Sequence, residues 1–178
     1  AIGGFIMRST TFALPKIFDE RLTDIANSAT LIGTYSFLVF ALAAFGQLAV
    51  GYLIDRYSIR IIFAVVAALQ AVFFVIMVIL TGLPALLISL CFMLVVFGQI
   101  PINDVLVGRI TRSEWRSRAY ALRYVITFSV SATAIPWIAW IHAEWSFVIL
   151  FIMMAIGAAG TFTIVLLLPN AIAKPKLS

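Results

Sequence analysis

Two long stretches of this sequence carry no Asp, Glu, Lys, Arg or His, and a short charged segment separates them. The first stretch, residues 28–54, has 27 residues, and the second, residues 61–80, has 20 residues. The hydrocarbon core of a bilayer is about 30 Å thick, and about 20 helical residues cross it. Both stretches are therefore long enough to span a membrane as helices. The charged segment between them, residues 55–60, is then the turn of a helical hairpin at the membrane surface.

The composition supports a membrane protein and argues against a soluble one. Hydrophobic residues make up 64% of the chain, charged residues 11%, and the mean hydropathy is +1.16. Soluble domains are about 45–50% apolar and about 25% charged. The net charge is +5, and the basic residues lie between apolar segments rather than along one polar face. We therefore expect the lipid bilayer as a partner, and no nucleic acid.

The sequence shows no pattern that is typical of an enzyme or of a metal or cofactor site. Cys91 is the one cysteine, so neither an intramolecular disulfide nor a metal cluster is expected. No nucleophile, base and orienting residue form a catalytic set, and no glycine-rich loop could hold a phosphate. We expect a protein that is not an enzyme and binds no cofactor.

Six apolar segments follow one another along the chain, which predicts an all-α membrane protein with six transmembrane helices. The chain starts without Met, inside an apolar run, so a processed, split or partial sequence is expected. Pro15 is expected to bend or end the first helix, and Gly98 to Asp104 to interrupt the fourth. The predicted helices cover about 1–18, 28–54, 61–80, 85–108, 119–141 and 145–168, joined by polar loops that include 55–60 and 109–118 and followed by a tail, 169–178.

The basic residues predict which side of the membrane each loop faces. Eight of the twelve Lys and Arg residues fall in the loops after the second and fourth helices and in the tail: Arg56, Arg60, Arg109, Arg112, Arg116, Arg118, Lys174 and Lys176. Excess Lys and Arg mark the cytoplasmic side of a membrane. We therefore expect a multi-pass protein of the inner, or cytoplasmic, cell membrane with both termini in the cytoplasm.

The charged turn has a distinctive spacing. Gly51 is followed after three residues by Asp55 and Arg56, and after three more by Arg60. A glycine near a helix end allows close approach of a neighbouring helix, and Arg56 and Arg60 share a face if the segment turns helically. This pattern resembles the signature loop of the major facilitator superfamily (MFS) of secondary transporters.

Three further segments resemble the C-terminal six-helix half of such a transporter: Ala13 to Lys16, Gly98 to Asp104, and Trp115 to Tyr120 leading into Arg123 and Tyr124. An N-terminal half is the alternative. The resemblance implies one MFS-type half bundle of a twelve-helix protein, with the N-terminal six-helix half missing. It implies secondary-active transport of a small solute by alternating access. The alternative function is a truncated or split protein that acts as a non-transporting interaction or regulatory subunit.

Polar residues inside the predicted helices are the candidates for a substrate pathway, because charges and amides in a membrane usually face a bundle interior. Arg8 lies near mid-depth and either holds an anionic group of the substrate or serves a structural role, and Thr11 adds a hydroxyl beside it. Gln99 and Asn103 are four residues apart and point the same way. The substrate is a small molecule, and whether it is anionic stays open.

Asp104 has two possible roles that the sequence does not separate. It is either a carboxylate that couples transport to protons or one partner of a salt-bridge latch with Arg109 or Arg123. Tyr124 and Thr127 follow Arg123 at the start of the fifth predicted helix. We expect them to line the inner mouth of the pathway.

Overall fold

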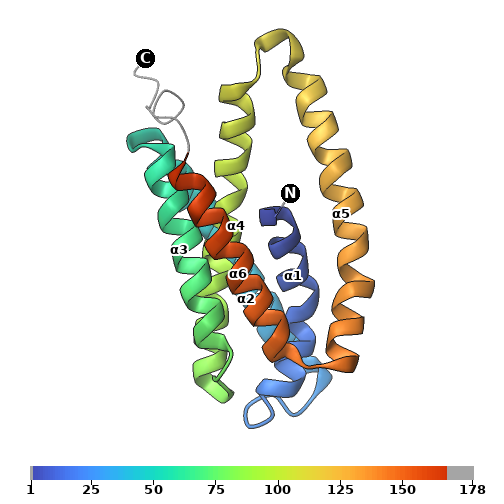
Figure 1. Cartoon of the computed structure of the whole chain (residues 1–178). Coiled ribbons are helices and arrows are strands. Elements are labelled where there is room, and N and C mark those ends of the chain that lie inside the picture. The colour runs from blue at the N-terminus through green and yellow to red at the C-terminus, as the bar shows by residue number, and fades with distance from the viewer. Residues whose placement is uncertain (1, 168–178) are drawn as a thin grey trace.

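The computed structural model describes residues 2–167, without the side chains of residues 134, 135, 142 and 143. All regular secondary structure within this part of the chain is helical (Figure 1). The elements are α1 (Ile2–Arg21), α2 (Ala29–Arg56), α3 (Ile59–Met77), α4 (Gly82–Ile110), the short 3-10 helix η1 (Ser113–Trp115), α5 (Arg116–Glu144) and α6 (Phe147–Leu166).

Consecutive α-helices run in opposite directions, so the connections alternate between two ends of the bundle (Figure 1). The α2–α3 turn and the α4–α5 connection lie at the same end, which we call the basic end because it carries Arg56, Arg60 and Arg112 to Arg118. The α1–α2, α3–α4 and α5–α6 connections lie at the opposite end. The two basic loops that the sequence placed on one side of a membrane therefore share one end of the structure.

Five of the helices, α2 to α6, are long and apolar enough to cross a membrane. The expectation of an all-helical membrane protein is confirmed to that extent. α1 is not among these five, because its 20 residues include Arg8, Lys16, Asp19, Glu20 and Arg21. A sixth span formed by α1 stays a prediction.

α2, α4 and α5 extend beyond the ranges predicted for them, whereas α3 ends at Met77 and α6 at Leu166, short of their predicted ends. Asp55 and Arg56, expected in a loop, form the last turn of α2, and Arg116 to Arg118 form the first turn of α5. The reason is that the end of an apolar run marks the lipid boundary, whereas helical hydrogen bonds continue in water. The predicted tail, 169–178, lies outside the described residues.

Neither Pro15 nor Pro101 ends its helix. α1 continues through Pro15 to Arg21, and α4 is continuous through Pro101 to Ile110. The expected interruption of the fourth helix between Gly98 and Asp104 is therefore wrong. Proline inside a membrane helix removes one backbone donor, but the helix can continue when neighbouring helices support it.

α2 and α4 pack closely because each has a glycine where they meet. A Cβ atom on Gly46 would lie 2.3 Å from the backbone oxygen of Leu94, and one on Gly98 would lie 2.6 Å from Cγ2 of Val50. Small residues at such crossings let two helix backbones approach in a membrane.

Three phenylalanines join α3, α4 and α6 in the core. The rings of Phe74, Phe92 and Phe151 are fully buried, with centroids 5.4 to 6.3 Å apart. Aromatic pairs at these separations attract each other beyond the effect of buried area. The cluster holds α6 against α3 and α4.

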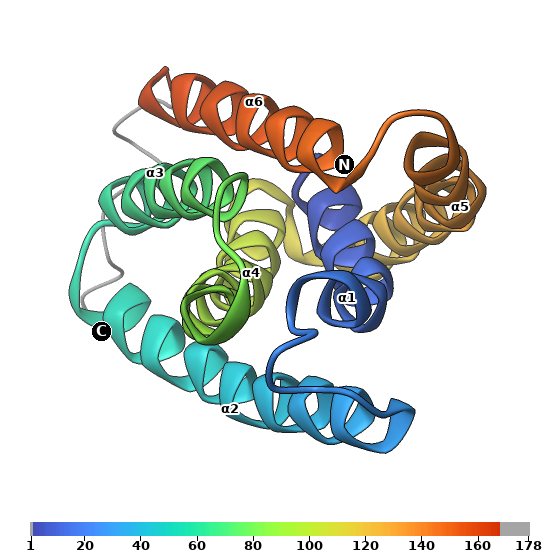
Figure 2. The ribbon, with the colours of Figure 1, turned by 90° about the horizontal axis from the view of Figure 1, so that it is seen from below.

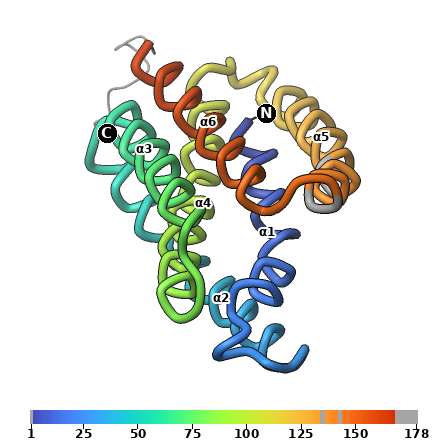
Figure 3. The backbone as a smooth tube through the Cα atoms, turned by 60° about the horizontal axis from the view of Figure 1, so that its bottom comes forward, coloured from blue at the N-terminus to red at the C-terminus, as the bar shows by residue number. Residues whose placement is uncertain are grey.

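α1 and α5 form the other side of the bundle. Viewed along the helices, α1 lies between α4 and α5, and α5 stands at the edge, packed mainly on α1 (Figure 2). The tube in Figure 3 shows α6 crossing in front of α4 and α1. Side chains of α5 contact α4 toward the basic end, and α1 lies between the two helices lower down.

Candidate functional site

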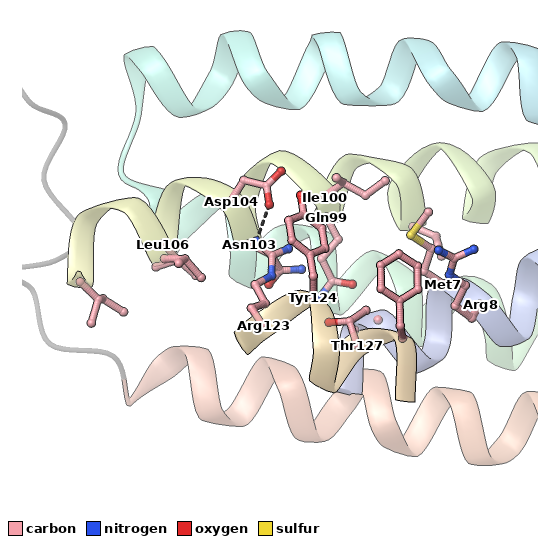
Figure 4. A pocket seen from close by; sticks show the side chains of 16 residues that line it. Met7, Arg8, Gln99, Ile100, Asn103, Asp104, Leu106, Arg123, Tyr124 and Thr127 are labelled. Atoms are coloured by element: carbon pink, nitrogen blue, oxygen red, sulfur yellow. Dashed lines mark hydrogen bonds and ion pairs between the residues drawn. The ribbon is translucent and has the colours of Figure 1, made fainter. Parts of the chain in front are cut away.

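A cavity of about 450 Å³ lies between α1, α4 and α5. Seven of the residues singled out from the sequence line it: Arg8, Gln99, Asn103, Asp104, Arg123, Tyr124 and Thr127. They come from α1 and from the consecutive helices α4 and α5, which are distant from α1 in sequence, and Figure 4 shows their side chains around one space. Their role in binding a substrate stays a prediction, but the structure brings them together.

Three contacts join α4 to α5 beside the cavity, toward the basic end. Nη1 of Arg123 forms an ion pair with Oδ1 of Asp104 (Figure 4). The hydroxyl of Tyr120 donates to the backbone oxygen of Asp104 at 2.8 Å, and Nη2 of Arg116 donates to the backbone oxygen of Gly108 at 3.2 Å. Of the two latch partners considered for Asp104, the structure pairs it with Arg123.

Arg8 contributes a second guanidinium from α1, away from this pair in the view of Figure 4. It is half-buried, and its Cζ lies 5.8 Å from the centroid of the Phe128 ring. Within residues 2–167, no carboxylate forms an ion pair with Arg8. Its charge therefore remains available in the cavity.

Two stacked aromatic rings connect the two arginines along α5. Tyr124 and Phe128 are one helical turn apart, with ring centroids separated by 6.2 Å and planes inclined by 28°. Arg8 lies over Phe128, and Cζ of Arg123 lies 5.9 Å from the Tyr124 centroid. Phe128 could not be recognised as a site residue from the sequence, because an aromatic residue in an apolar helix is ordinary.

The amide of Gln99 is held in place from two sides. Nε2 of Gln70, on α3, donates to Oε1 of Gln99 at 3.0 Å, and both side chains are buried. Gly3 of α1 faces the same amide, since a Cβ atom there would lie 2.8 Å from Nε2 of Gln99. Gln70 was not among the candidates from the sequence, because a single amide in an apolar stretch does not show which helix it faces.

Thr11 does not line the cavity. Its hydroxyl donates to the backbone oxygen of Met7 at 2.7 Å, within α1. A threonine can satisfy its hydroxyl on its own helix in this way.

The signature-loop residues also lie elsewhere, at the basic end of α2 and α3. Arg56 stacks on Tyr52, with Cζ 4.4 Å from the ring centroid, whereas Arg60 donates to the backbone oxygen of Leu166 on α6. Arg56 and Arg60 do not share a helix face, because α2 ends between them.

The close helix approach expected at Gly51 is absent from the described structure, because a Cβ atom on Gly51 would meet nothing within 4 Å. Asp55 is exposed.

The chain matches a known protein family. The family model described as Major Facilitator Superfamily matches residues 1–178. No curated protein and no solved structure matches the chain.

Proposed function

The chain belongs to the major facilitator superfamily, and from that premise we propose that it moves a small solute across a membrane by alternating access. The observation that carries the proposal is the cavity between α1, α4 and α5. It gathers Arg8, Gln99, Asn103 and the Asp104–Arg123 pair inside a bundle whose helices are otherwise strongly apolar. Polar groups at membrane depth are costly unless they face a binding site or a water-filled path.

The described helices form one wall of the solute pathway, and a second six-helix bundle forms the other. Tyr124 and Phe128 support this, because they line the cavity and yet are 50% and 58% exposed. Large rings that border a polar cavity are usually covered by another protein surface. Rocking of one bundle against the other would then expose the cavity to each side in turn.

The basic end faces the cytoplasm in this proposal. It carries the arginines of both basic loops, whereas Lys16 near the opposite end is paired with Asp19, with Nζ 2.7 Å from Oδ2. An excess of basic residues beside short loops favours the cytoplasmic side. The protein would then be a multi-pass protein of the cytoplasmic membrane.

The Asp104–Arg123 pair would act as a latch at the cytoplasmic mouth. It joins α4 to α5 on the side of the cavity nearest the basic end. Separation of these helices has to break the pair. A proton-coupling role for Asp104 would require the same step, since protonation of the carboxylate releases Arg123.

Alternating access can be tested before the solute is known. Asn103→Cys, made in the full-length protein without other cysteines, places a thiol in the cavity. We expect a membrane-impermeant maleimide to label it from both sides in right-side-out and inside-out vesicles. Val72→Cys, on an exposed part of α3 outside the cavity, is the control and should label from neither side. Labelling of Asn103→Cys from one side alone would favour a non-transporting subunit.

A further inference from the structure

The charges around the cavity do not cancel. Its charged lining consists of Arg8, Asp104 and Arg123, and the last two form an ion pair. The remaining charge is the Arg8 guanidinium, which no carboxylate of residues 2–167 neutralises. A half-buried guanidinium in an apolar bundle is stabilised by an anion at hydrogen-bonding distance.

We propose that this cavity selects a small organic monoanion whose carboxylate binds Arg8 and whose body is a flat, aromatic ring. The proposal rests on the proposed function, because it names the substrate class of the same site. One unpaired positive charge matches one negative charge. A phosphate monoester carries about −1.5 to −2 near pH 7 and would leave a surplus negative charge in the cavity.

The guanidinium of Arg8 is held in a restricted position in which it can bind a carboxylate. It lies over the ring of Phe128, with Cζ 5.8 Å from the ring centroid, and this contact restricts the side chain. A planar guanidinium binds the two oxygens of a carboxylate through two parallel hydrogen bonds. Lysine has the same charge but lacks this geometry.

The stacked rings beside Arg8 are the reason for proposing a ligand with a flat, aromatic body. Tyr124 and Phe128 present their exposed surfaces next to the guanidinium, in one continuous strip along α5. An aromatic ligand whose carboxylate is on Arg8 can lie against this strip in an offset stack. The amides of Gln99 and Asn103 face the same space from α4 and can bind a polar substituent of the ring.

The test uses three acids, each with its neutral amide: benzoate, phenylacetate and nicotinate against benzamide, phenylacetamide and nicotinamide. The readout is the thermal unfolding midpoint of the full-length protein in detergent at pH 7 and constant ionic strength. A ligand that binds the folded state raises this midpoint. We expect at least one acid to raise it by roughly 2–4 °C while its amide and inorganic phosphate do not.

The variants decide whether Arg8 is responsible. In Arg8→Gln the rise should disappear, whereas in the control Arg56→Gln, which removes an arginine outside the cavity, it should persist. If Arg8→Gln does not yield folded protein, Arg8→Lys replaces it, and the concentration of acid needed for half the rise should increase at least several-fold. The inference is overturned if no acid stabilises the protein, if an amide or phosphate does so equally, or if Arg8→Gln and Arg8→Lys respond like the unchanged protein.

Uptake into proteoliposomes separates this inference from the proposed function. An acid that binds through Arg8 but is not taken up would leave the monoanion site standing and contradict transport of that ligand. Uptake of a neutral solute by a protein that fails to bind the acids would support transport and overturn the monoanion site.

Discussion

Asp104 of α4 and Arg123 of α5 form an ion pair across the mouth of the cavity, and the neighbouring backbone oxygen of Asp104 accepts a hydrogen bond from Tyr120. The side chains of the pair are 40% and 25% exposed, so water screens their attraction. Pairs of this exposure stabilise a fold by about 1 kcal/mol or less. The pair is therefore too weak to hold the fold, but strong enough to bias the separation of two helices.

Loss of this pair should favour opening at the basic end. Arg123→Gln removes the bias, and a change of up to about 1 kcal/mol corresponds to a change of up to about fivefold in the equilibrium between closed and open states. We expect maleimide labelling of Asn103→Cys from the basic end to rise by up to that factor, with little change in the unfolding temperature. Unchanged labelling would remove the pair from the gating mechanism.

An exchange of the two charges separates a latch from a proton-coupling carboxylate. Asp104→Arg combined with Arg123→Asp keeps an ion pair at the same place. If the pair is a latch, the exchange should return the labelling of Asn103→Cys from the basic end to its original level, and uptake should persist. If Asp104 must take up a proton, arginine at its position cannot replace it, so uptake should be lost.

Gly46 and Gly33 of α2 provide a matched pair for helix packing. A Cβ atom at Gly46 would lie 2.3 Å from the backbone oxygen of Leu94, whereas one at Gly33 would meet nothing within 4 Å. Gly46→Ala should lower the free energy of unfolding by about 1–3 kcal/mol, because the backbones of α2 and α4 must separate. Gly33→Ala should be neutral or slightly stabilising. Unfolding in a denaturing detergent series measures both, and equal effects would contradict the α2–α4 packing.

The sequence predicted the helices and the polar residues of the cavity for one physical reason. Polar groups are rare inside membrane helices and tend to face the bundle interior, so Arg8, Gln99, Asn103 and Asp104 could be identified and the structure places them around one space. Thr11 was placed there too, but its hydroxyl is satisfied by its own helix. The transport role of all of these residues stays a prediction.

The features that the sequence did not predict depend on how the helices are rotated and spaced. Gln70 is a single amide in an apolar stretch, and only the approach of α3 to α4 brings it to Gln99. The same holds for Phe128, whose importance comes from the position of Arg8 on another helix. For Gly51 the sequence predicted a contact that the structure lacks. A close approach at Gly51 requires a neighbouring helix, and the described residues place none there.

Arg21 ties the end of α1 to the end of α3. Its guanidinium donates to the backbone oxygens of Met77, Val78 and Leu80, with distances of 3.3 Å to Val78 and 2.8 Å to Leu80, and stacks over Phe151. These oxygens lie at or just beyond the end of α3, where backbone acceptors have no partner within the helix. Arg21→Gln should lower the free energy of unfolding by about 1–3 kcal/mol, measured in the same detergent series. Arg56→Gln is the control, with an expected change of less than about 0.5 kcal/mol.

The hydrogen bond between Gln70 and Gln99 should position the second amide in the cavity. Gln70→Leu removes the donor and leaves the buried oxygen of Gln99 without its partner, which costs about 1–3 kcal/mol in the folded state. The side chain of Gln99 is then free to turn, so we expect the initial rate of solute uptake to fall as well. Gln47→Leu is a matched control, because Gln47 is a single amide of the apolar α2 that lies outside the cavity lining.

Gly3→Ala should reproduce the loss of uptake from the other side of Gln99, because the added Cβ atom would lie 2.8 Å from Nε2 of Gln99 and displace it. Normal uptake in both Gln70→Leu and Gly3→Ala would show that the position of Gln99 does not matter for the solute.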